Sequence, residues 1–323
     1  MSRVAFFLVL TLLLSAGPGA SFAGGDVYQR LERMGAAMSH MTYQGTFVYV
    51  SGETVESMRV THIVDEHGIR ERMVSVSGSQ GELVRDSDGV RWTSGEEGTV
   101  MADTASNRGF FPDLPLGDAL RESEAYKLEI GGKLKIAGLV GQKLSIVPVD
   151  EYRYGYNLWQ EIQSGMLLRW ELTDSNGKIL SKLIFTELKM GSEVDAQELL
   201  GSSSKGSMMP GSAEDELGRH TIQLLPKWQP KDIPVGFRLA SHRFQKTGKL
   251  SSLEHLVYSD GIAAVSIYVE TGQDKPELES GLSQMGSTHF FTRVEGNENI
   301  TVLGDVPAVT VELIGESLRL SRP

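Results

Sequence analysis

The fold class follows from one stretch, Tyr43-Gln44-Gly45-Thr46-Phe47-Val48-Tyr49-Val50. Its aromatic and β-branched residues follow a period of two, as expected of a strand. Directly before it, residues 26–38 carry apolar side chains at helical spacing, and Asp26 is placed to cap that helix. The chain is therefore expected to pass from one amphipathic helix into a β-sheet.

Turn signals then recur at short intervals. Ser51-Gly52, His67-Gly68, Asp88-Gly89 and Asn176-Gly177 separate apolar or alternating runs, and such dipeptides adopt the positive φ angles of tight hairpins. Strands are expected at residues 54–66, 69–77, 81–87, 89–93, 126–136, 139–148, 152–161, 166–174 and 178–188. Antiparallel pairing of neighbours predicts a large, strongly curved sheet.

One apolar segment, residues 110–120, interrupts these strands and indicates a loop that leads into a short helix. With the first helix it would cover the concave face of the sheet. Irregular apolar loops often cover a site, and each buried methylene contributes about 0.8 kcal/mol, so a pocket there would suit acyl chains. The lining candidates are Phe47, Tyr49, Trp92, Phe110, Phe111, Leu114, Leu116 and Trp170. Outside the loop, plain core packing is the stronger interpretation of each single residue.

The chain then changes in composition. Residues 189–217 are polar and rich in Ser and Gly, which predicts a flexible linker. A second β-rich unit follows, with strands expected at 236–245, 251–259, 261–270, 288–295, 299–304 and 306–314. The fold class is thus mainly β with few helices (α+β). The expected segments are a signal peptide at 1–23, a first domain at 24–190, a linker at 191–217 and a second domain at 218–323.

The N-terminus has the three-part pattern of a secretory signal. Arg3 precedes an apolar run at residues 4–14, and Ser21-Phe22-Ala23 places small residues where a signal peptidase cleaves. The apolar run is too short to cross a hydrocarbon core of about 30 Å. Cleavage is expected near Ala23. Because the chain has no Cys for a disulfide or a lipid anchor, the product is expected to be a soluble periplasmic protein stabilised by ordinary cores.

Charge and motifs argue against several functions. The formal net charge of −11 disfavours a nucleic-acid binder, although a local basic patch for an anionic lipid head group stays open. The chain contains none of the common catalytic, phosphate-binding or metal-binding sequence motifs, and its seven His residues are scattered. We therefore predict no catalytic residue, no metal and no cofactor, and a protein that is not an enzyme. A site assembled from distant residues stays open, as does a homo-oligomer.

Six motifs resemble those of the RseB/MucB family. They are residues 43–49 (YQGTFVY), 69–72 (IRER), 152–156 (YRYGY), 234–237 (PVGF), 258–263 (YSDGIA) and 302–307 (VLGDVP). Each motif is weak alone, but the set occurs in the same order and covers nearly the whole chain after the signal. Some relatives carry a pair of cysteines in the C-terminal domain, which this chain lacks, so no redox role is expected.

The resemblance implies a periplasmic regulator of the sigma-E envelope stress response. Such a protein binds the periplasmic part of a membrane-spanning anti-sigma factor and shields it from proteases, and lipopolysaccharide or mislocalised lipoprotein releases it. The first domain would resemble lipoprotein carriers with an unclosed β-barrel, and the second would supply much of the anti-sigma contact. The partner-binding candidates there are Trp228, Phe237, Tyr258 and Tyr268. The alternatives are a lipid or lipoprotein carrier and an envelope hydrolase with a dispersed site.

Overall fold

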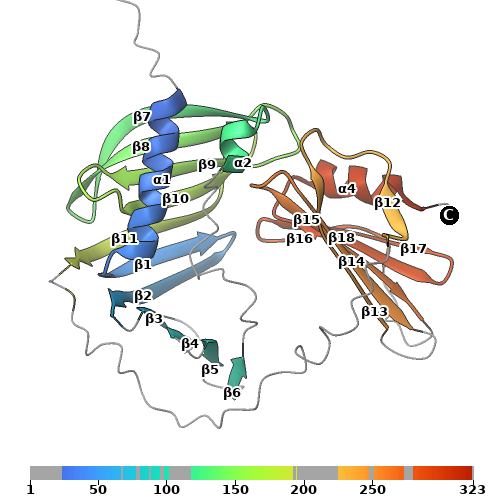
Figure 1. Cartoon of the computed structure of the whole chain (residues 1–323), viewed down its shortest axis with the longest axis horizontal. Helices are drawn as coiled ribbons and strands as arrows, with labels where there is room; N and C mark the ends of the chain where they lie inside the picture. Colours follow the sequence, from blue (N-terminus) through green and yellow to red (C-terminus); the bar gives the residue numbers. More distant parts are fainter. Residues whose placement is uncertain are drawn as a thin grey trace, which may run out of the picture.

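The protein has two β-rich units, which Figure 1 shows side by side. The computed structural model describes residues 24–66, 68–77, 81–86, 89–94, 98–101, 118–191, 194, 225–246, 251–272 and 279–321. We call residues 24–191 the N-terminal unit and residues 225–321 the C-terminal unit. The predicted signal peptide, the loop at 110–117 and residues 195–217 of the predicted linker lie outside the described residues.

An antiparallel sheet of 11 strands forms the N-terminal unit, in the order β6-β5-β4-β3-β2-β1-β11-β10-β9-β8-β7. The strands are β1 (Tyr43–Ser51), β2 (Thr54–Asp65), β3 (Gly68–Ser75), β4 (Gly81–Asp86), β5 (Gly89–Ser94), β6 (Gly98–Met101), β7 (Tyr126–Ile136), β8 (Leu139–Pro148), β9 (Gly155–Glu161), β10 (Leu167–Thr173) and β11 (Ile179–Met190). Because β6 and β7 end the order, the sheet is unclosed. The predicted fold class and curved sheet are confirmed.

Two local features of the sequence account for this sheet. The predicted hairpin glycines adopt positive φ angles, +58° at Gly52 and +77° at Gly177. In the middle of the sheet, β1 pairs with both β2 and β11, and Gly45 lies opposite Val60 and Leu188. A Cβ atom at Gly45 would come within 2.6 Å of the Glu187 carbonyl oxygen, so this position requires glycine.

The helix α1 (Gly24–His40) lies across one face of this sheet (Figure 1). Its buried residues Val27, Leu31 and Met34 recur every three or four positions and join the core of the unit. The predicted amphipathic helix is therefore confirmed, with a longer extent. A second, short helix, α2 (Asp118–Glu122), buries Leu120 in the same core, as the sequence predicted for the end of the 110–120 segment.

A polar turn anchors α1 to the sheet. Arg33 of the helix donates hydrogen bonds to the carbonyls of Ile162 and Gln163, in the turn between β9 and β10. The buried carboxylate of Glu161 organises that turn, since its Oε2 accepts from the Gln163 and Ser164 backbone N–H groups at 2.9 and 2.5 Å. Although burial alone raises the pKa of Glu161, these hydrogen bonds and the Arg33 charge outweigh it and lower the pKa.

This turn gives a pH-dependent prediction. Glu161→Gln is expected to lower the free energy of unfolding at neutral pH by about 1.5–3 kcal/mol, the usual range for hydrogen bonds to a charged group. Because the folded-state pKa is lowered, the carboxylate stabilises the fold above its unfolded-state pKa and loses that effect as pH falls through the folded-state pKa. Urea unfolding from pH 7 to pH 3 should therefore show the two proteins converging. A gap that stays constant with pH would contradict the assignment.

The C-terminal unit is built on a sheet of six strands in the order β13-β14-β15-β18-β17-β16, with β12 and β19 forming a separate pair. The strands are β12 (Trp228–Pro230), β13 (Arg238–Lys246), β14 (Ser252–Ser259), β15 (Ala264–Thr271), β16 (Gly281–Met285), β17 (Thr288–Glu295), β18 (Glu298–Gly304) and β19 (Leu318–Leu320). The helix α4 (Ala308–Ser317) packs against β17 and β18. The sequence did not predict the short strands β6, β12, β16 and β19.

The strand predicted at residues 306–314 is wrong, because this segment contains α4. Pro307 occupies the N-cap position, and the buried residues Val311, Ile314 and Leu318 lie on one side at helical spacing. Gly315 lets the helix approach Phe291 of β17 closely. The β-branched composition of the segment favours a strand, but packing on the sheet overrides that preference. In the described part of the chain, no helix has the length and apolar character needed to span a bilayer.

Candidate functional site at the sheet face and the domain junction

Two regions of the described structure bear on function: the helix-covered face of the large sheet and the junction between the units. On the sheet face, Phe47 and Trp170 are buried in the core, and Phe47 meets Phe185 edge to face with 5.6 Å between ring centroids. Tyr49 is only partly buried against the same core. The Trp92 side chain and Phe110, Phe111, Leu114 and Leu116 lie outside the described residues. The acyl-chain pocket stays a prediction.

The same face carries a buried polar row that no local sequence pattern indicates. Tyr43 of β1, His62 of β2 and Glu71 of β3 lie opposite one another in register. His62 Nδ1 is 3.0 Å from Glu71 Oε2, and the Tyr43 ring stacks on the His62 ring at 4.8 Å. Burial and the Glu71 charge raise the pKa of Tyr43 well above its ordinary value. Residues of two motifs, 43–49 and 69–72, thus lie in one buried polar row, which is joined by ring stacking and a hydrogen bond.

At the junction, Arg153 reaches from the turn between β8 and β9 into the C-terminal unit. Its side chain has no exposed surface, and its Nε donates to Asp260 Oδ2 at 2.5 Å. The other nitrogens donate to Asp150 of the same turn and to the Val235 carbonyl. Burial lowers the pKa of Arg153, but the hydrogen bond and charge of Asp260 outweigh this and raise it, so the guanidinium is charged.

Further polar contacts join the units around this ion pair. The Tyr126 hydroxyl donates to Asp260 at 3.2 Å, and Thr310 Oγ1 donates to the Tyr152 carbonyl at 2.8 Å. The Tyr154 hydroxyl lies 3.2 Å from His289 Nδ1. Burial, with nearby negative charge, raises the pKa of Tyr126 and raises that of Tyr154 to about 12. Both phenols are therefore neutral hydrogen-bonding groups at physiological pH.

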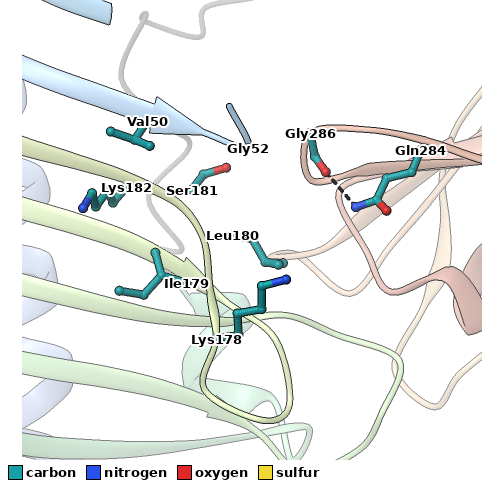
Figure 2. A pocket seen from close by; sticks show the side chains of 9 residues that line it. All are labelled: Val50, Gly52, Lys178, Ile179, Leu180, Ser181, Lys182, Gln284 and Gly286. Carbon is teal, nitrogen blue, oxygen red and sulfur yellow. Dashed lines mark hydrogen bonds between the residues drawn. The ribbon is translucent and has the colours of Figure 1, made fainter. Parts of the chain in front are cut away.

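A cleft opens between the units along the same end of the large sheet. It has a volume of about 390 Å³. Figure 2 shows Lys178 and Leu180 of the N-terminal unit on one side, and Gln284 of β16 and Gly286 of the β16–β17 turn on the other. Its lining residues are Val50, Gly52, Lys178, Ile179, Leu180, Ser181, Lys182, Gln284 and Gly286. Two lysines beside apolar side chains give this cleft a basic and partly apolar wall.

The predicted partner-binding residues do not line this cleft. Trp228, Phe237 and Tyr258 are buried members of its core. Tyr268 is half-buried and stacks on the His255 ring with 4.2 Å between centroids. A partner could therefore reach Tyr268 directly, whereas the other three side chains support the surface from within. Their role in partner binding stays a prediction.

Sequence reasoning missed Arg153 and Asp260 as functional candidates. Both belong to motifs that carry the family resemblance, and two further motifs, 234–237 and 302–307, supply the Val235 and Val306 carbonyls near the junction. An Arg within a run of tyrosines was the available signal, since such an Arg often stacks on aromatic rings. Among the described residues, no group of three or more His, Asp or Glu side chains is placed to hold a metal ion.

Two models of known protein domains match the chain. The model of the MucB/RseB N-terminal domain matches residues 26–202, and that of the MucB/RseB C-terminal domain matches residues 223–319. The chain belongs to the MucB/RseB family. The resemblance inferred from the six motifs is thereby confirmed. The two matched regions also follow the two sheets of the structure, one family domain to each unit.

Relatives match over nearly the whole length of this MucB/RseB family member. The sigma factor AlgU regulatory protein MucB of Pseudomonas aeruginosa is 26% identical over 98% of both chains. The sigma-E factor regulatory protein RseB of Escherichia coli K12 is 24% identical over 96% of this chain and 94% of its own. Among solved structures, MucB in complex with MucA(peri) matches with a TM-score of 0.67 at 23% identity, covering 92% of this chain and all of that one. MucB alone matches with a TM-score of 0.56 at the same identity, over 93% and 99%.

Proposed function

We propose that this chain is a periplasmic regulator of a sigma factor, acting through the periplasmic part of a membrane-spanning anti-sigma factor. The observation that carries this proposal is the match of both family domains, in order, to a chain whose relatives are named sigma factor regulatory proteins. That a relative, MucB, has been solved in complex with MucA(peri) supports a periplasmic protein segment as the partner. The regulatory names of the relatives support a binding role rather than catalysis.

The proposed mechanism is competition between two ligands. The bound chain shields the anti-sigma segment from proteases, and lipopolysaccharide or mislocalised lipoprotein binds the N-terminal unit and favours the unbound state. Coupling between two such sites is typically about 1–3 kcal/mol, which changes an affinity about 5- to 150-fold. The secretory pattern of residues 1–23 supports export and cleavage near Ala23. The partner would then supply the attachment to the membrane.

A protease-protection assay tests this mechanism. The purified anti-sigma periplasmic segment is digested with a periplasmic protease, alone, with this chain, and with this chain plus lipopolysaccharide. We expect the chain to slow cleavage and lipopolysaccharide to restore the original rate. Cleavage that is equally fast with and without the chain would contradict the shielding role. Protection that lipopolysaccharide leaves unchanged would contradict the lipid switch but leave the shielding intact.

A second candidate, a lipid or lipoprotein carrier, is favoured by the unclosed sheet with a helix across its face (Figure 1). A carrier must release its lipid to an acceptor membrane, whereas a sensor need not. Chain loaded with a fluorescent lipopeptide is therefore mixed with acceptor vesicles. Transfer that saturates with chain concentration, in a chain that gives no protease protection, would favour the carrier over the regulator.

A further inference from the structure

The junction between the two units depends on one fully buried charge. The guanidinium of Arg153 lies 4.9 Å from the centroid of the Phe237 ring and 5.8 Å from that of Tyr126, so an aromatic side chain of each unit faces it. Its hydrogen-bond acceptors also come from both units, Asp150 from one, and Asp260 and the Val235 carbonyl from the other. Separating the units would therefore remove two of its three acceptors.

Asp260 is also buried at the junction and uses both carboxylate oxygens there. Its side chain is 2% exposed, and its Oδ2 accepts hydrogen bonds from both Arg153 and Tyr126 of the N-terminal unit. Its other oxygen, Oδ1, accepts from the Ile262 and Ala263 N–H groups and holds the β14–β15 turn. One carboxylate thus shapes the turn of its own unit and binds the neighbouring unit at the same time. The turn therefore presents Oδ2 to Arg153 in a fixed position.

The chemistry of this junction suits a contact that opens and closes. Moving an ion pair from water into a protein interior brings little net gain, because desolvation offsets most of the attraction. When the units separate, water hydrates both Arg153 and Asp260 and offsets the loss of their contact. Apolar side chains exposed by the same separation would gain no such compensation. The cores of the two sheets form separate clusters. Ile262, a partly buried residue of the C-terminal unit, packs against the N-terminal core. Polar junctions of this kind permit relative motion of domains.

We propose that Arg153, Asp150, Asp260 and the Val235 carbonyl form a latch that sets the orientation of the two units. With the latch closed, the β16–β17 turn lies beside the β1–β2 turn, where a Cβ at Gly286 would be 3.1 Å from Ser51 Oγ. The cleft of Figure 2 then has residues of both units in its lining. With the latch open, the units reorient and the cleft loses its second wall. This latch goes beyond the proposed function and does not rest on it.

Because the chain has no Cys, distances across the cleft can be measured with two introduced labels. Glu53, in the β1–β2 turn, and Met285, at the end of β16, are exposed and adjoin the lining residues Gly52 and Gly286, so Glu53→Cys and Met285→Cys carry a spin-label pair in the full chain. In the labelled parent we expect one narrow distribution of short distances. Arg153→Gln should shift the majority of molecules to longer distances and broaden the distribution, while far-UV circular dichroism stays unchanged.

Two further variants make the result decisive. Asp260→Asn keeps the oxygen that holds the β14–β15 turn but removes the charge, so it should open the latch even if Arg153→Gln does not fold. Arg169→Gln is the matched control, because Arg169 pairs with Glu171 within the N-terminal unit. It should leave the distances unchanged. Unchanged distances in folded Arg153→Gln or Asp260→Asn, or an equal shift in Arg169→Gln, would overturn the proposal, and neither outcome depends on an anti-sigma partner.

Discussion

Gly45→Ala is expected to destabilise the N-terminal unit by about 3 kcal/mol or more, at or above the upper end of ordinary overpacking costs. The added Cβ would lie 2.6 Å from the Glu187 carbonyl oxygen and 2.8 Å from the Phe185 ring. The carbonyl belongs to β11, which pairs with β1 from Ser181 to Met190, so the carbonyl cannot move away without breaking the sheet. Denaturant unfolding followed by circular dichroism measures the loss.

Gly132→Ala is the matched control for this substitution. It introduces the same methyl group into the same sheet, on the edge strand β7, where nothing lies within 4 Å of the new Cβ. We expect its free energy of unfolding to stay within about 0.5 kcal/mol of the parent. If the two alanine variants are equally stable, the close approach of β1 to β11 is not what requires glycine at position 45.

Trp228→Ala is expected to cost about 3–5 kcal/mol of the stability of the C-terminal unit, the usual range for a large buried aromatic. Trp228 begins β12, pairs with Leu320 of β19 and is 3% exposed within the core beside α4. Its intrinsic fluorescence is lost with it, so unfolding is followed by circular dichroism. Leu225→Ala, at a residue that is 87% exposed, should stay within about 0.5 kcal/mol of the parent.

This pair of variants separates packing from direct contact. If Trp228 touched a partner without supporting the core, Trp228→Ala would weaken binding while its unfolding midpoint stayed at the parent value. We expect instead that Trp228→Ala lowers the unfolding midpoint, and that binding is lost only because the C-terminal unit unfolds. A folded variant with parent stability would contradict the core assignment of Trp228.

The strands of the N-terminal unit, apart from the short β6, could be predicted because their signals are local. The alternating pattern at 43–50 lies within the strand that it predicts, and the glycines at 52 and 177 lie within the turns that they predict. The structure confirms this strand and both turns. The segment 306–314 was mispredicted because its β-branched residues favour a strand locally, whereas its contacts with β17 and β18 stabilise a helix. Local preference cannot account for packing against strands formed elsewhere in the chain.

The candidate site was harder to predict for a related reason. Arg153 and Asp260 are 107 positions apart, and no spacing rule joins them. The inner face of the sheet depends on register, since a shift by one residue exchanges every inward side chain. The structure places Phe47 and Trp170 inside and Tyr49 only partly inside. Hydrophobic character alone had made all three residues equal candidates for lining the pocket.

Direct titration of the chain with the anti-sigma periplasmic segment tests the central claim most simply. The segment from the same genome is added to the purified chain in a calorimeter, at a fixed ionic strength. We expect saturable binding with a Kd of about 1 μM or tighter, which corresponds to a binding free energy of about −8 kcal/mol. The affinity should fall when lipopolysaccharide is present. Absence of saturable binding, by a chain whose two units are shown to be folded, would contradict it.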